Sequence, residues 1–94
     1  MRKVTVIRSQ KALLPFNKGK ILIDNSECGI VKAGKTTELE IPDGAHDIQV
    51  IIAAIPAVNS NILNIEESDG DTVFDIKITV PLKGGDTIAE LTKQ

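Results

Sequence analysis

The residues that could carry chemistry in this chain are few, and the two most reactive are each present once. Cys28 is the only cysteine and His46 the only histidine. A thiol and an imidazole that meet can act as nucleophile and base. No Gly-rich oxyanion turn or helix start lies beside Cys28, and its neighbours Asp24 and Glu27 are acidic, which disfavours a reactive thiolate. We therefore expect Cys28 to be a small core residue or a half-buried strand residue.

His46 follows a predicted turn and begins a predicted strand. General base catalysis needs an orienting partner and a pocket. The adjacent Asp47 points to the opposite face of the strand, so it is poorly placed to orient the ring. We expect a structural or exposed imidazole. One cysteine with one histidine also falls short of the three or four ligands of a zinc site. The sequence thus predicts no catalytic, cofactor-binding or metal-binding residue, and an enzyme acting through Cys28 or His46 is the least favoured hypothesis.

An acidic cluster surrounds one predicted turn and comprises Glu66, Glu67, Asp69 and Asp71. Oxygen-rich loops can bind calcium. The spacing of an EF-hand is absent, and Asp-Gly-Asp is also an ordinary solvated hairpin sequence. We favour the hairpin.

Composition and charge exclude several classes of function. The chain has 94 residues and a net charge of −2, and its basic residues are scattered, so no stripe is available to neutralise nucleic-acid phosphates. Trp and Tyr are absent. The longest apolar run, Val50 to Val58, contains Pro56 and is too short for a membrane helix. With one cysteine and no apolar leader, we expect a cytoplasmic chain without a signal peptide or membrane insertion.

Short alternating apolar stretches, separated by turn dipeptides, organise most of the chain. This pattern is typical of a small antiparallel β protein. The predicted strands cover residues 3–9, 20–23, 28–32, 35–41, 46–54, 62–67 and 71–80, and residues 87–92 form either an edge strand or a frayed tail. About seven or eight strands cannot bury a face as one flat sheet. We therefore predict an all-β fold, a small antiparallel β-sandwich, as one domain over residues 1–94, with 82–94 a candidate for a partly ordered tail.

The alternation also predicts which side chains face the core. On successive strands these are Val4 and Val6, then Leu39 and Ile41, then Ile48, Val50 and Ile52, then Phe74, Ile76, Ile78 and Val80. Ile51 lies on the opposite face of its strand, so that strand is a candidate for burial on both sides. At the turns, Asn25 is expected in a left-handed conformation, and Gly44 supplies positive φ after Pro42-Asp43.

Residues 21–31 (ILIDNSECGIV) and 39–48 (LEIPDGAHDI) carry a pattern that resembles PEGA-like β-sandwich modules. Those modules have an I-x-I-D-G-x-x-x-G hairpin and a later P-G-x-H-x-[IVL] turn. Asn25 stands where they often have Gly, and Asp43 separates Pro42 from Gly44. The opening MRKVTVIR is also similar to small uncharacterised bacterial proteins that carry this module alone. The resemblance implies a non-catalytic domain, often linked to cell-envelope or surface proteins, with no common cofactor and a structural role for His46.

Two apolar loops, residues 13–16 and 53–58, are the best sequence candidates for an interface. They either cap the open ends of the sandwich or contact a partner or a second copy. The predicted interface residues are Leu14, Phe16, Ile55 and Val58. Pairing of exposed edge strands is a second route to a dimer. The favoured function is a non-enzymatic interaction or scaffold module that binds a protein partner or itself. The alternative is a module that binds carbohydrate or a cell-envelope ligand, although sugar sites usually use Trp or Tyr.

Overall fold

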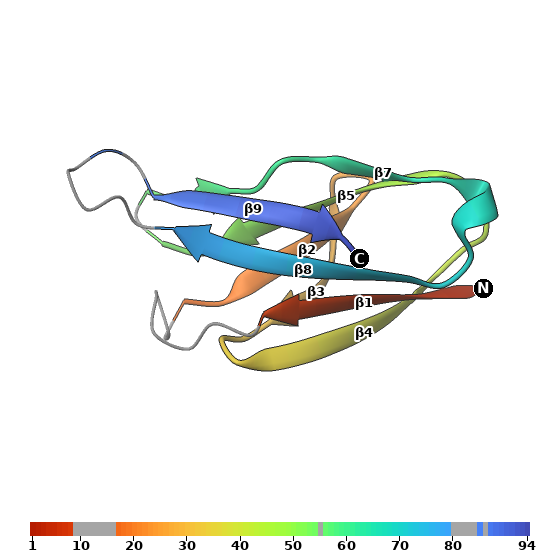
Figure 1. The fold of residues 1–94 in the computed structure, drawn as a ribbon, viewed down its shortest axis with the longest axis horizontal. Helices are drawn as coiled ribbons and strands as arrows, with labels where there is room; N and C mark the ends of the chain where they lie inside the picture. The colour runs from red at the N-terminus through yellow and green to blue at the C-terminus, as the bar shows by residue number, and fades with distance from the viewer. Residues whose placement is uncertain (9–16, 55, 80–84, 86) are drawn as a thin grey trace.

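Two β-sheets pack face to face in the structure, a computed structural model that describes residues 1–8, 17–54, 56–79, 85 and 87–94 (Figure 1). Sheet A has four strands in the order β4-β1-β8-β9, namely β1 Arg2–Arg8, β4 Lys35–Ile41, β8 Thr72–Thr79 and β9 Ile88–Lys93. Sheet B has five, namely β2 Gly19–Ile23, β3 Ser26–Val31, β5 His46–Ile52, β6 Val58–Asn59 and β7 Leu63–Ile65. Its order is β3-β2-β5-β6, and β7 also pairs with β5. The predicted small β-sandwich is confirmed.

One ladder departs from the predicted antiparallel arrangement. β1 and β8 are parallel neighbours, with Val6 opposite Phe74, whereas every other strand ladder in the described residues is antiparallel. Parallel neighbours need a long crossover connection. The chain provides one because it builds β4 and all of sheet B between β1 and β8. A sequence pattern of alternating residues does not distinguish the two directions.

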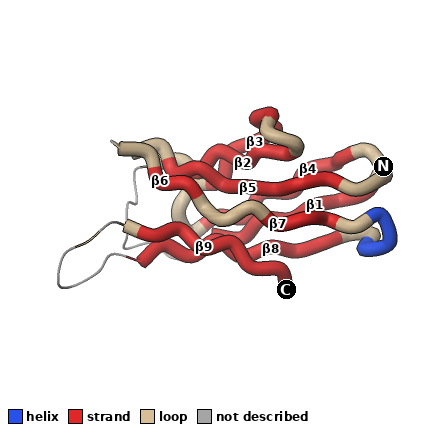
Figure 2. The backbone as a smooth tube through the Cα atoms, turned by 90° about the horizontal axis from the view of Figure 1, so that it is seen from above, coloured by secondary structure: helices blue, strands red, loops and turns tan. Residues whose placement is uncertain are grey.

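The strand predictions differ from the structure mainly after Ile52. The segment between the predicted strands 46–54 and 62–67 contains the short β6, so the described residues form nine strands rather than seven or eight. The turn predicted within the acidic cluster includes a short 3-10 helix, η1 Glu67–Asp69, which lies at the same end of the molecule as the N-terminus (Figure 2). Residues 88–93 form an edge strand, because β9 pairs with β8 from Phe74↔Lys93 to Thr79↔Ile88.

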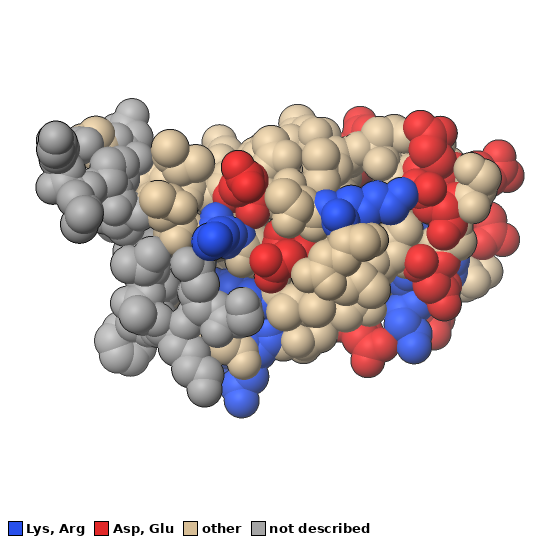
Figure 3. Space-filling view, in the orientation of Figure 1, with Lys and Arg blue, Asp and Glu red and all other residues tan. Residues whose placement is uncertain are grey.

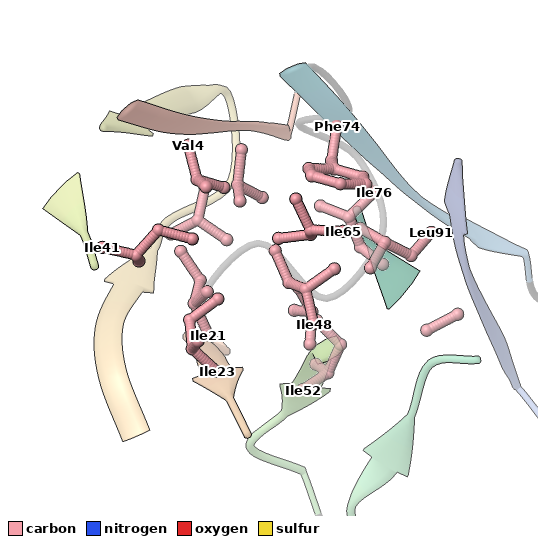
Figure 4. Close-up of a cluster of buried hydrophobic side chains, with 14 of the residues drawn as sticks. Val4, Ile21, Ile23, Ile41, Ile48, Ile52, Ile65, Phe74, Ile76 and Leu91 are labelled. Carbon is pink, nitrogen blue, oxygen red and sulfur yellow. The ribbon is translucent and has the colours of Figure 1, made fainter. Parts of the chain in front are cut away.

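The core lies between the sheets and is almost entirely aliphatic (Figure 4). Phe74 is its one aromatic member among the described residues. The predicted inward-facing residues are buried, namely Val4, Val6, Ile41, Ile48, Val50, Ile52, Phe74, Ile76 and Ile78, and Leu39 is half-buried against them. Val80 lies outside the described residues. β-branched side chains fit this arrangement because they pack well on a pleated surface.

The β2–β3 hairpin turn uses two left-handed residues, not one. Asp24 has φ 51° and Asn25 has φ 67°, and they link Ile23 to its partner Ser26. Positive φ at both central residues is the type I′ geometry that matches the twist of a two-residue hairpin. The expectation for Asn25 is confirmed, and Asp24 joins it. Gly44 has φ 113°, as predicted for the turn between β4 and β5.

Among the described residues, no helix has the length and apolar character needed to cross a membrane.

Candidate functional site

Of the four predicted interface residues, only Val58 lies within the described residues. It is half-buried, sits opposite Ile52 in the β5–β6 ladder, and packs against the core. This position fits the alternative that the loop caps one end of the sandwich. Leu14, Phe16 and Ile55 lie outside the described residues, so their role as interface residues stays a prediction.

His46 is held between two turns by both of its ring nitrogens. Nδ1 lies 2.6 Å from Oδ2 of Asp24, and Nε2 lies 2.9 Å from the carbonyl oxygen of Pro42. Both neighbours are acceptors, so both nitrogens donate only when the ring is the imidazolium ion. The hydrogen bond to the Asp24 carboxylate is the main cause that raises the pKa of His46, and the same bond lowers the pKa of Asp24. The structure thus favours a charged imidazole.

This geometry makes His46 a structural clamp. A general base needs a free nitrogen lone pair within reach of the proton that it removes. Here one nitrogen is occupied by a carboxylate and the other by a backbone carbonyl. The clamp ties the β2–β3 turn to the β4–β5 turn. The backbone contact to Pro42 agrees with the structural role expected for His46.

Asp24 is the partner of His46 that sequence reasoning missed. Its left-handed turn places the carboxylate beside the start of β5, where Oδ1 accepts the N–H of Asp47 at 2.9 Å and Oδ2 meets His46. Its own N–H donates to the carbonyl of Asp47 at 2.9 Å. The short carboxylate of an aspartate in a tight turn can accept backbone N–H groups, and the aspartate that ends the I-x-I-D sequence was the available signal.

The prediction that Cys28 is a core or half-buried residue is wrong, because Cys28 is exposed. The β2–β3 ladder shifts register between Ile21 and Leu22, so Gly29 pairs with Ile21 while Glu27 pairs with Leu22. Cys28 is the extra residue of this bulge. A bulge leaves one residue unpaired and re-aims its side chain. The thiol contacts only its own strand, where Sγ lies 3.4 Å from the carbonyl oxygen of Ser26.

The acidic turn is occupied by internal contacts. Oδ2 of Asp69 accepts the N–H of Glu66 at 2.8 Å, and Oδ1 pairs with Nζ of Lys93 at 2.9 Å. The hydrogen bond from Lys93 is the main cause that lowers the pKa of Asp69. Oδ1 of Asp71 accepts the N–H of Lys3 at 2.8 Å. Among the described residues, no group of His, Cys, Asp and Glu side chains could hold a metal ion.

The side chain of Arg2 links two turns at the end of the sandwich that carries the acidic turn. Its side chain is buried, and Nη1 donates to the carbonyl oxygens of Glu66 at 2.6 Å and Glu67 at 3.2 Å, while Nη2 donates to that of Gly44. One guanidinium therefore joins the β4–β5 turn to the turn that holds η1. Acidic side chains gather on the surface of this end (Figure 3).

The solvent-facing side of sheet B carries an aliphatic patch that was not predicted as a surface. We call it the sheet-B patch; it consists of Leu22, Ile30, Ile51 and Ile62, and the exposed Lys20 lies between Ile30 and Ile51 in the sheet. Leu22 and Ile51 are half-buried, Ile30 is 38% exposed, and Ile62 is 61% exposed. A hollow of about 340 Å³ opens at one side of it, lined by Leu22, Ile62, Gln49, Asp24, Asn25, Asp47 and Ile48. The outer face of sheet A is more polar and carries the Lys3–Glu38 ion pair.

The free edge of β9 is closed by a side chain. The side-chain amide of Asn61 imitates a neighbouring strand. Its Oδ1 accepts the N–H of Leu91 at 2.7 Å, and its Nδ2 donates to the carbonyl oxygen of Leu91 at 2.9 Å. Ser60 forms an isolated parallel bridge with Ala89 next to it. At the sheet-B edge, the bulge at Cys28 interrupts β3. Such devices hinder pairing with a further strand along β9 and β3.

Comparison of the chain with protein-family models, with curated protein sequences and with solved structures gives no significant match. The resemblance to PEGA-like modules therefore stays a prediction, and any statement about function depends on the residues themselves.

Proposed function

We propose that this chain is a non-enzymatic interaction module that binds a protein surface through the sheet-B patch. The observation that carries the proposal is the patch itself. Ile30 of β3 and Ile62, the residue before β7, are exposed on the side of sheet B where Leu22 and Ile51 are half-buried. Grouped apolar side chains on the surface of a folded domain mark contact sites more often than scattered ones do.

Several polar side chains of the described residues support this proposal because they are engaged in holding the fold. His46 and Asp24 clamp two turns, Arg2 binds turn carbonyls, and Asp69 pairs with Lys93. Catalysis needs a base, a nucleophile and a charge-stabilising group that converge on one point. The single histidine, which could supply the base, is instead held by local structure at both ring nitrogens.

Carbohydrate or cell-envelope ligand binding is the alternative function. Sugar rings are usually held by stacking on aromatic faces, and the chain has no Trp or Tyr. A test with immobilised glycans and peptidoglycan addresses it directly, and retention at the sheet-B patch would overturn the proposal in favour of this alternative.

The proposal is tested with the chain as bait in a lysate of the source cell and with two matched variants. Ile62→Lys places a charge in the patch, whereas Ile88→Lys places the same charge on β9, where Ile88 is 56% exposed against 61% for Ile62. We expect proteins, among them the chain itself, that are retained by the wild type and by Ile88→Lys but not by Ile62→Lys. Equal retention by all three baits would overturn the proposal.

A further inference from the structure

We infer that His46 is a pH-dependent switch of the β4–β5 turn: the imidazolium ion binds this turn, and the neutral ring releases it while keeping its bond to the β2–β3 turn. The ring lies between the two turns, with the Asp24 carboxylate on one side and the carbonyl oxygen of Pro42 on the other. These two acceptors differ in charge, and that difference decides which contact survives loss of the proton. The switch operates whether or not the sheet-B patch binds a partner.

The ring of His46 is largely enclosed at one end of the sandwich, on the inward-facing side of β5. Its side chain is 13% exposed, and along the strand it shares that side with the buried Ile48. Nδ1 lies 2.6 Å from Oδ2 of Asp24, and Nε2 lies 2.9 Å from the oxygen of Pro42. Both distances are those of hydrogen bonds, and both require the ring nitrogen to donate. The arrangement is therefore that of the imidazolium ion.

Two charged side chains act on the ring, and they come from different elements. The hydrogen bond to Asp24, on the β2–β3 turn, is the main cause that raises the pKa of His46, whereas the positive charge of Arg2, on β1, lowers it. The partner of His46 in β7 is the uncharged Ile65. Two further carboxylates on neighbouring segments are engaged elsewhere, namely Asp43 with the amino group of Met1 at 3.4 Å and Asp47 with the amide of Asn64 at 3.1 Å.

Loss of the proton leaves the ring with one N–H donor and one lone pair, so it can no longer donate to both neighbours. With the remaining proton on Nε2, the Nδ1 lone pair would face the anionic oxygen of Asp24 at 2.6 Å. With the proton on Nδ1, the Nε2 lone pair faces the neutral oxygen of Pro42 at 2.9 Å. A hydrogen bond to an ionised acceptor is roughly twice as strong as one between neutral groups. The proton therefore stays on Nδ1, and the contact to Pro42 is the one that is lost.

Release of Pro42 is local, because other contacts keep both turns attached to the sandwich. Nη2 of Arg2 donates to the carbonyl oxygen of Gly44, and a guanidinium stays charged throughout the pH range in which histidine titrates. Oδ1 of Asp24 accepts the N–H of Asp47 at 2.9 Å, and this bond does not involve the ring. We therefore expect the β4–β5 turn to detach on its Pro42 side while the sandwich stays folded.

The direction of the switch follows from the two pKa shifts. The pKa of His46 is raised above its ordinary 6.5, so the ring is charged below that raised value and becomes neutral as the pH rises through it. Pro42 is therefore held at lower pH and released at higher pH. The pKa of Asp24 is lowered below 3.8, so its carboxylate stays ionised during this change and keeps its bond to Nδ1.

The test is a pH titration, from about pH 6 to about pH 9, of the isotope-labelled chain followed by nuclear magnetic resonance. The nitrogen chemical shifts of the ring distinguish a protonated from an unprotonated nitrogen. The carbonyl carbon shift of Pro42 reports its hydrogen bond. In the wild type we expect the neutral ring of His46 to carry its proton on Nδ1, and we expect the Pro42 carbonyl shift to change with the same midpoint as the ring.

Asp24→Asn should reverse both results. Its Oδ1 still accepts the N–H of Asp47, its Nδ2 becomes a donor in the place of Oδ2, and asparagine tolerates the left-handed conformation of this turn. The neutral ring of His46 can then accept at Nδ1 and donate from Nε2 to Pro42. We expect the proton on Nε2 and a Pro42 carbonyl shift that does not follow the titration.

Asp47→Asn is the matched control, because it removes the same charge from a carboxylate that bonds to Asn64 rather than to the ring. It should behave as the wild type does. The inference is overturned by a neutral wild-type ring with its proton on Nε2, by a Pro42 shift that does not follow the titration of His46, or by equal behaviour of the two variants. Circular dichroism checks folding, and if Asp24→Asn does not fold, the two wild-type measurements decide the inference by themselves.

Discussion

Replacing Arg2 by Met tests whether a buried cation holds two turns of the sandwich together. The guanidinium donates to the carbonyl oxygens of Glu66 and Glu67 on one side and of Gly44 on the other. Met keeps most of the aliphatic volume and removes every donor. The substitution also removes the cost of burying a charge, which can make such replacements neutral. The two effects oppose each other. The sign of the change in stability therefore depends on how well water replaces the hydrogen bonds that the carbonyl oxygens lose.

We expect the lost hydrogen bonds to dominate. A hydrogen bond to a charged group contributes about 1.5–3 kcal/mol, and water can reach the carbonyls of exposed turns in part. With at least one bond lost at each of two turns, the free energy of unfolding should fall by about 2–4 kcal/mol. For a domain of this length each kcal/mol lowers the melting temperature by about 4–8 °C, so a loss of about 8 °C or more is expected.

Urea and thermal denaturation followed by circular dichroism measure this change. Arg2→Lys keeps the charge but lacks the planar guanidinium that reaches both turns. Its stability should therefore lie between that of the wild type and that of Arg2→Met. Lys3→Met is the matched control, because Lys3 is exposed and pairs only with the exposed Glu38; its melting temperature should stay close to that of the wild type. An Arg2→Met variant within about 2 °C of the wild type would refute the reasoning.

Three further predictions concern pH, a close approach of strands and the core. The pKa of His46 is raised above its ordinary 6.5 and that of Asp24 is lowered below 3.8, so the clamp should stabilise fully between these two pH values. Its contribution is lost as pH rises through the raised pKa of His46, and as pH falls through the lowered pKa of Asp24; a stability difference from His46→Gln that is constant from about pH 6 to 9 would contradict this. Gly19→Ala should lower the free energy of unfolding by about 1–3 kcal/mol in urea denaturation, because a Cβ there would lie 3.0 Å from Cγ1 and 3.2 Å from the backbone oxygen of Val31. An unchanged free energy of unfolding would argue against such close packing of Gly19 on Val31. Phe74→Leu should cost about 1–2 kcal/mol, since it removes ring volume from a fully buried site, and a change below about 0.5 kcal/mol would show that the core refills the space.

The strands and the core could be predicted from local pattern. Alternation along a strand places successive side chains on opposite faces wherever that strand pairs. Val4 and Val6, or Phe74 and Ile76, therefore had to face the same side, and the structure buries them all. Turn residues such as Gly44 also act locally, since φ depends on the residue itself.

The clamp and the exposed thiol could not be predicted in the same way. His46 meets Asp24 across 22 residues because β2 pairs with β5, and no spacing in the sequence expresses that pairing. Cys28 turns outward because the ladder gains one residue beside Leu22. A single extra residue reverses the face on which a side chain lies.

The amino-acid sequence alone determined that this chain forms an aliphatic sandwich of short strands, because the two-residue period of extended backbone and the conformations of turn residues are local properties. Only the tertiary structure decided which strands became neighbours, which acid reached the single histidine, and which isoleucines were left facing solvent. Those outcomes depend on long-range register, where the free energy of the whole packed core selects among arrangements that are locally equivalent.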